Sequence, residues 1–109
     1  MQQTFTAGNH LDDQGRPAGG FVHATGLEIA WQNGPLREQG TDEPDAPNGA
    51  FVETVIAAAI QRIEHYQETQ FRCRENALAI TKLEEALHWL NARTARREAD
   101  GTEGTHQGA

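Results

Sequence analysis

The residues best placed to hold a ligand lie between positions 72 and 97, a stretch whose pattern predicts one long amphipathic helix. Arg93 and Arg97 are four residues apart, so a helix places both on one face. Two guanidinium groups on one face can grip the oxygens of a pyrophosphate bidentately. The alternative is a solvated basic helix end, which the helix macrodipole would stabilise. Six of the nine basic residues lie in this stretch, although the whole chain is acidic at −7: Arg72, Arg74, Lys82, Arg93, Arg96 and Arg97.

Asn76, near the start of the same predicted helix, falls in register with its apolar stripe. A polar amide there needs a hydrogen-bond partner or a wet pocket. Asn76 and Arg93 are 17 residues apart, roughly 25 Å along a helix, so one small ligand does not reach both within a chain. A pocket that used both would therefore join two chains packed head to tail. The alternative is that Asn76 is a structural cap or a buried amide that sets the register.

Tyr66 stands where a first helix is expected to end. An aromatic ring at that place can stack on a nucleotide base. It can equally lie at the rim of the core, and the sequence leaves both interpretations open. The two tryptophans, Trp31 and Trp89, are expected to be core anchors.

Two helices are expected to position these residues. Asn48 is a credible N-cap for the first, which should end near residues 67–69, and the second should run from about Cys73 to Glu98. A short link between them gives an antiparallel helical hairpin. The apolar residues of the second helix alternate by three and four positions, as in coiled coils, and predict a dimer through this helix: Ile80, Leu83, Leu87 and Leu90.

The part before the helices has β character. Leu27–Trp31 alternates apolar and polar residues, which is typical of a half-buried strand, and Gly26 predicts the turn of a small hairpin. Residues 1–19 are rich in turn-forming types, so we expect turns and loops there. The expected fold class is α+β. A single domain would comprise a β-rich part (1–47) with a small antiparallel sheet, a long helical hairpin (48–100) that oligomerises, and a C-terminal tail (101–109).

Composition and motifs exclude several functions. The net charge of −7 argues against binding to DNA or RNA polymers. No apolar run approaches the roughly 20 residues that span a bilayer, and the first residues do not resemble a signal peptide, so a cytoplasmic protein is expected. The single Cys73 and five unclustered histidines predict neither an internal disulfide nor a metal site. Because no phosphate-binding glycine loop or nucleophile–base motif is present, we expect neither an enzyme nor a cofactor.

Several blocks of the sequence carry a resemblance to a known family. They are Pro-Ala-Gly-Gly (17–20), Ile-Ala-Trp-Gln-Asn-Gly-Pro (29–35), Asn-Gly-Ala-Phe-Val-Glu (48–53), Cys-Arg-Glu-Asn-Ala-Leu-Ala-Ile (73–80), Ala-Leu-His-Trp-Leu (86–90), Arg-Thr (93–94) and Glu-Gly-Thr-His (103–106). With these blocks the chain resembles the Thoeris anti-defence proteins of phages and prophages, specifically the first family of that name. The hairpin is also similar to related phage proteins that sequester cyclic oligonucleotides of the CBASS defence system.

The resemblance implies a small sheet, a helical hairpin and a homodimer that often assembles into a hexamer. It implies tight, non-covalent capture of cyclic ADP-ribose isomers, glycocyclic ADP-ribose among them, which bacterial TIR enzymes make in the infected host's cytoplasm. The captured signal then does not activate its effector, and Thoeris immunity is blocked. Carried onto this chain, the polar ligand contacts are Asn76, Arg93 and Arg97, and the base-stacking position is Tyr66.

The resemblance also implies that some relatives hold cyclic di- or trinucleotides at separate sites in the hexamer. The resemblance places such a site here at Gly104, Thr105 and His106, whereas the acidic loop 38–46 does not align with the family pattern. Two other functions stay open beside this sponge. A structural helical-hairpin or adaptor module would leave the arginine pair without a role, and a phosphodiesterase would need a metal cluster or a base–nucleophile pair.

Overall fold

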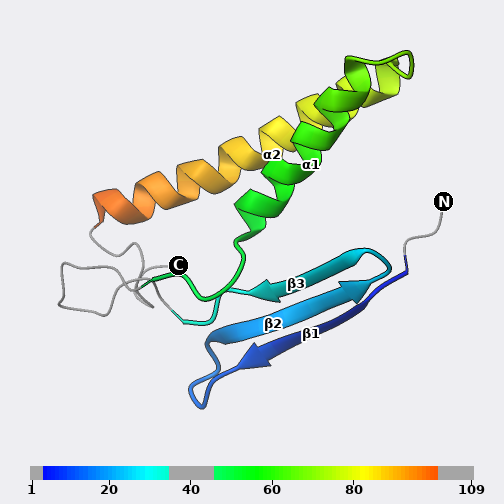
Figure 1. Ribbon diagram of the computed structural model, residues 1–109. Coiled ribbons are helices and arrows are strands. Elements are labelled where there is room, and N and C mark those ends of the chain that lie inside the picture. Colours follow the sequence, from blue (N-terminus) through cyan, green and yellow to red (C-terminus); the bar gives the residue numbers. More distant parts are fainter. Residues whose placement is uncertain (1–3, 35–45, 101–109) are drawn as a thin grey trace. The chain divides into compact units, whose positions relative to one another are not determined.

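The computed structural model describes residues 4–34 and 46–100 (Figure 1). One antiparallel sheet with the strand order β1-β2-β3 is followed by two helices, which confirms the expected α+β class. Of the two compact units, one contains the sheet and comprises the chain up to Phe51 together with the chain from Arg97 onward, and the other spans Val52–Arg96. The elements in chain order are β1 (Thr6–Leu11), β2 (Pro17–Ala24), β3 (Leu27–Trp31), α1 (Val52–Gln67) and α2 (Arg74–Ala99).

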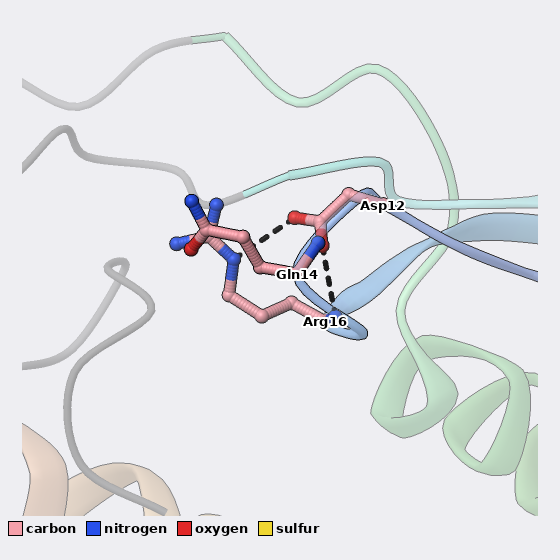
Figure 2. Close-up of polar contacts among 3 residues, drawn as sticks. All are labelled: Asp12, Gln14 and Arg16. Atoms are coloured by element: carbon pink, nitrogen blue, oxygen red, sulfur yellow. Dashed lines mark hydrogen bonds and ion pairs between the residues drawn. The ribbon is translucent and has the colours of Figure 1, made fainter.

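The turn between β1 and β2 is closed by its own first residue, Asp12 (Figure 2). One carboxylate oxygen accepts hydrogen bonds from the backbone N–H groups of Gln14 and Arg16, each at 2.9 Å. The other accepts from the Arg16 Nε, also at 2.9 Å. These bonds, led by the one from the Arg16 backbone, lower the pKa of the Asp12 carboxyl because they favour its charged form. Gly15 completes the turn with a φ of 78°, a left-handed conformation that glycine adopts without strain.

Strand β1 lies inside residues 1–19, so the prediction of turns and loops for this stretch is wrong. Gly8 and Asn9 disfavour a strand by composition, but Gly8 pairs directly with Phe21 of β2. The Phe21 ring lies where a side chain at position 8 would stand, and a Cβ there would overlap it. A neighbouring aromatic ring thus covers the strand in place of the glycine's own side chain.

The backbone that leads into α1 is hydrogen-bonded to the end of β3. Ala50 forms a parallel bridge with Trp31. Its N–H donates to the Ala30 carbonyl at 2.7 Å, and its carbonyl accepts from the Gln32 N–H at 3.0 Å. These bonds extend the edge of the sheet by one short bridge and fix the chain just before the helix begins.

Asn48 adds a side-chain clasp to this bridge. Its Oδ1 accepts from the Asn33 N–H at 2.8 Å, and its Nδ2 donates to the Asn33 carbonyl at 2.8 Å. The Gln32 Oε1 in turn accepts from the Asn48 N–H at 2.9 Å. The prediction of Asn48 as an N-cap is therefore wrong. Helix α1 begins only at Val52, and the amide is used in the clasp instead.

The helices begin and end close to the predicted residues, at Gln67 for the end of α1 and at Arg74 and Ala99 for α2. Their apolar faces are covered only in part by the chain itself. Ile60 is the one hydrophobic side chain that is buried among the described residues. The predicted stripe of α2 is half-buried: Ile80, Leu83, Leu87 and Leu90.

Trp89 of α2 is 71% exposed, so the expectation of a core anchor is wrong for the single chain. Trp31 is half-buried at the end of β3. The apolar area that α2 leaves uncovered is available for association, and the dimer through this helix stays a prediction. No helix among the described residues is long and apolar enough to cross a membrane.

Candidate functional site: the hairpin tip and the arginine end of α2

Tyr66 lies in the last turn of α1 and is 39% exposed. Arg62 stands one helical turn earlier and touches it in two ways. The Arg62 Nε donates a hydrogen bond to the Tyr66 hydroxyl at 3.2 Å, and the guanidinium carbon lies 5.0 Å from the ring centroid. This distance is within the usual range of a cation–π contact. The ring is held in place but remains accessible to a ligand.

The link between the helices is pinned by the side chain of Gln67. Its Nε2 donates to the Cys73 carbonyl at 3.1 Å, and its Oε1 accepts from the Cys73 N–H at 3.0 Å. Thr69 bridges the same link, because its hydroxyl donates to the Tyr66 carbonyl at 2.6 Å and accepts from the Phe71 N–H at 3.1 Å. These hydrogen bonds hold the link in one conformation and tie it to the end of α1.

Asn76 joins this network from the first turn of α2, where it is half-buried. Its Nδ2 donates to the Phe71 carbonyl at 3.4 Å, which is long for a hydrogen bond and easily exchanged for a better partner. A chain of hydrogen bonds thus runs from the Tyr66 carbonyl through Thr69 and Phe71 to the Asn76 amide. These bonds connect the helix end that carries Tyr66 with the helix start that carries Asn76, and we define residues 62–76 as the hairpin tip.

Arg93 and Arg97 lie in the last part of the same uninterrupted helix. Arg93 is exposed and Arg97 is half-buried. One turn separates them, whereas the 17 residues from Asn76 to Arg93 correspond to about 25 Å of helix. Within one chain the structure therefore keeps the arginine pair well away from Asn76.

Other predicted features lie elsewhere or outside the described residues. Gly104, Thr105 and His106 lie beyond residue 100, and the acidic loop 38–46 falls almost entirely in the gap between 34 and 46. Cys73 is exposed and has a free thiol. Across residues 4–34 and 46–100, no group of three or more His, Cys, Asp or Glu side chains is arranged to hold a metal ion.

The contact from Arg62 to Tyr66 was not predicted from the sequence. The spacing of four residues from Arg62 to Tyr66 was the available signal, because side chains at that spacing meet on a helix surface. An arginine that both bonds the hydroxyl and lies over the ring makes Tyr66 a prepared aromatic platform. Together with the Asn76 amide, the tip can offer a base one stacking surface and one hydrogen-bonding group.

The helical hairpin is shared with a known protein family. The model of the "Acb2/Tad1, hairpin domain" matches residues 24–95, about two thirds of the chain. This chain belongs to the Acb2/Tad1 hairpin family. The matched part of the Acb2/Tad1 hairpin chain contains β3, all of α1 and most of α2, and therefore Tyr66, Asn76 and Arg93. Arg97 lies just beyond the matched range.

A relative shows the same affiliation. The protein named "Thoeris anti-defense 1", from Bacillus phage SBSphiJ7, is 52% identical to this Acb2/Tad1 hairpin chain over 79 residues. The aligned region covers 72% of this chain and 51% of the relative. The chain thus spans about half the length of that relative. The resemblance to the first Thoeris anti-defence family is confirmed at the level of the family.

Proposed function

We propose that this protein captures cyclic ADP-ribose signals made by bacterial TIR enzymes, glycocyclic ADP-ribose among them, and holds them without degrading them. It would act in the cytoplasm of an infected bacterium, where removing the signal blocks Thoeris immunity. The observation that carries the proposal is the 52% identity over 79 residues to a phage protein named "Thoeris anti-defense 1". The positions of the candidate ligand contacts on the hairpin support the proposal.

The ligand contacts that we propose match the chemistry of a cyclic ADP-ribose. Tyr66 offers a ring that is 39% exposed for stacking on the adenine. Arg93 and Arg97, one turn apart, would bind the pyrophosphate through charge-assisted hydrogen bonds. Asn76, whose bond to the Phe71 carbonyl is long, would exchange it for a polar group of the ligand. Stacking and charge together allow tight binding and slow release, which sequestration requires.

The pocket that we propose is shared between two chains. Since about 25 Å of helix separates Asn76 from Arg93, Tyr66 and Asn76 of one chain would meet the arginine pair of another. A homodimer with two such pockets would satisfy this geometry, and the proposal includes further assembly of such dimers into a hexamer. The half-buried stripe of α2 supplies an apolar face for the association.

The deciding experiment measures uptake and recovery of the ligand. The purified protein is incubated with glycocyclic ADP-ribose, desalted and then heated to release whatever it holds. Mass spectrometry of the released fraction should show intact ligand, which a sponge predicts. A chemically altered ligand would indicate a phosphodiesterase. No uptake would overturn the proposal and favour a structural hairpin module.

A second ligand class is proposed for Gly104, Thr105 and His106, namely the cyclic di- and trinucleotides of CBASS. These residues lie outside the described part of the chain. His106→Ala should abolish cyclic trinucleotide binding and leave the capture of cyclic ADP-ribose intact. Equal binding of both ligands by this variant and the native protein would remove the assignment of these residues.

A further inference from the structure

Arg62 restrains the aromatic ring at the hairpin tip, beside the tilted His65 ring, whose centroid lies 6.1 Å from that of Tyr66. A tyrosine at the exposed end of a helix can rotate about two side-chain torsions and offers two equivalent ring faces. The bond from the Arg62 Nε to the hydroxyl, at 3.2 Å, restricts the position of the ring tip. The guanidinium carbon, 5.0 Å from the centroid, stands over one face.

We propose that Arg62 is a positioning residue of the ligand pocket. It occupies one face of the Tyr66 ring and fixes its orientation, so that a purine base stacks on the opposite face. This inference rests on the proposed function, because it assigns a role toward the same ligand. It extends that function by naming the residue that prepares the stacking platform before the ligand arrives.

The physical argument is pre-organisation. Binding a ligand normally immobilises each rotamer-rich side chain that it contacts, which weakens the complex. A ring that Arg62 already holds loses little further freedom when a base stacks on it. Residues 62 and 66 are four apart on α1, so the helix itself places their side chains next to each other. Arg62 is itself exposed, so its contact with the ring does not depend on deep burial.

Titration of variants with glycocyclic ADP-ribose tests this role. Arg62→Ala should weaken binding by roughly 3- to 10-fold, the cost of immobilising one such side chain, and Arg62→Lys should recover part of the loss because it keeps the cation. Arg74→Ala is the matched control. It removes the same charge from the same hairpin tip, at an exposed residue whose side chain makes no hydrogen bond or ion pair among the described residues. Its affinity should equal that of the native protein.

A double-mutant comparison distinguishes a role of Arg62 that acts through Tyr66 from a direct contact between Arg62 and the ligand. If Arg62 acts by holding the ring, Arg62→Ala should have no further effect in a Tyr66→Ala background. An undiminished loss in that background would mean that Arg62 binds the ligand itself, and the proposal would be overturned. Equal losses in Arg62→Ala and Arg74→Ala would likewise overturn it, because they would show only a general charge effect.

A measurement without ligand keeps the inference separate from the proposed function. The chain has a single tyrosine, so ¹³C-labelled tyrosine gives ring signals of Tyr66 alone. Ring relaxation should show faster motion in Arg62→Ala than in the native protein and no change in Arg74→Ala. Unchanged ring motion in Arg62→Ala would overturn the positioning role. If instead the native protein takes up no cyclic ADP-ribose, the proposed function fails, and the ring measurement still decides whether Arg62 holds Tyr66.

Discussion

Two weakly binding variants should restore tight binding when they are mixed, if each pocket takes Asn76 from one chain and Arg97 from another. The perturbation combines an Asn76→Ala chain with an Arg97→Ala chain and allows their subunits to exchange. In a mixed dimer one pocket then collects both lesions, and the other pocket has both native residues. The intact pocket should bind as tightly as those of the native protein.

The length of α2 explains why a single chain does not form the whole pocket, and the cost of one lost contact gives the expected change in affinity. About 25 Å of helix lies between Asn76 and Arg93, and Arg97 is one turn further. A ligand pocket of up to about 1,000 Å³ is roughly 12 Å across if it is compact, so a single chain does not bridge this distance. Loss of one charge-assisted contact costs about 1.5–3 kcal/mol, or about 10- to 150-fold in affinity. Random exchange makes about half of the dimers mixed, so about a quarter of all sites should bind tightly.

Titration calorimetry is the assay, because it reports affinity and the number of tight sites together. Native mass spectrometry verifies that the subunits have exchanged. The matched control mixes Arg93→Ala with Arg97→Ala, which places one lesion in every pocket and should restore nothing. If the Asn76→Ala and Arg97→Ala mixture regains no tight sites despite verified exchange, the two residues do not share a pocket across chains, and the site as proposed is wrong.

Three further perturbations test the fold. Leu87→Asp places a charge in the half-buried stripe of α2. The variant should have a lower mass by light scattering and a weaker helical circular dichroism signal. An unchanged folded oligomer would show that the stripe is not the interface. Asn48→Ala removes two side-chain hydrogen bonds and should lower the free energy of unfolding by about 1 kcal/mol in chemical denaturation, whereas Asn91→Ala, at an exposed helical position, should not. The pKa of Asp12 is lowered, chiefly by the Arg16 backbone hydrogen bond, so its contribution is present above the ordinary value of 3.8 and is lost as the pH falls through the folded-state pKa. Asp12→Asn should therefore lose less stability than the native protein when urea denaturation is carried from about pH 5 to pH 2, and identical losses would contradict this account.

The helices could be predicted well because periodicity is a local property of the sequence. The spacing of apolar residues located both helices, with the end of α1 at Gln67 and the start of α2 at Arg74. Strand β1 was missed for the opposite reason. Its suitability for a sheet comes from Phe21, a residue of the neighbouring strand that covers Gly8. A cross-strand contact of this kind leaves no periodic signal within the strand itself.

Polar side chains were harder to assign, because a local and a distant partner compete for the same group. Asn48 has the residue type and position of an N-cap, yet its amide bonds the backbone of Asn33, fifteen residues earlier. In the candidate site, too, some features were predicted from the sequence and others were not. Tyr66 and Asn76 were placed at one end of the hairpin from helical spacing alone, whereas the contact from Arg62 to the Tyr66 ring was found only in the structure. The proposed pairing of the two ends across chains depends on a second copy, which the pattern of one chain does not describe.

The clasp between Gln32 and Asn48 has a consequence for how this sequence can vary. Because these residues are joined directly, at 2.9 Å, the chain between them starts and ends at one place. The entropy of closing such a loop grows only with the logarithm of its length, so that doubling the segment adds about 0.6 kcal/mol. Insertions between the two clasped residues should therefore leave the bridge between Ala50 and Trp31 intact. This part of the chain is a natural position for a fluorophore or an affinity tag that reports on the protein without altering its helices.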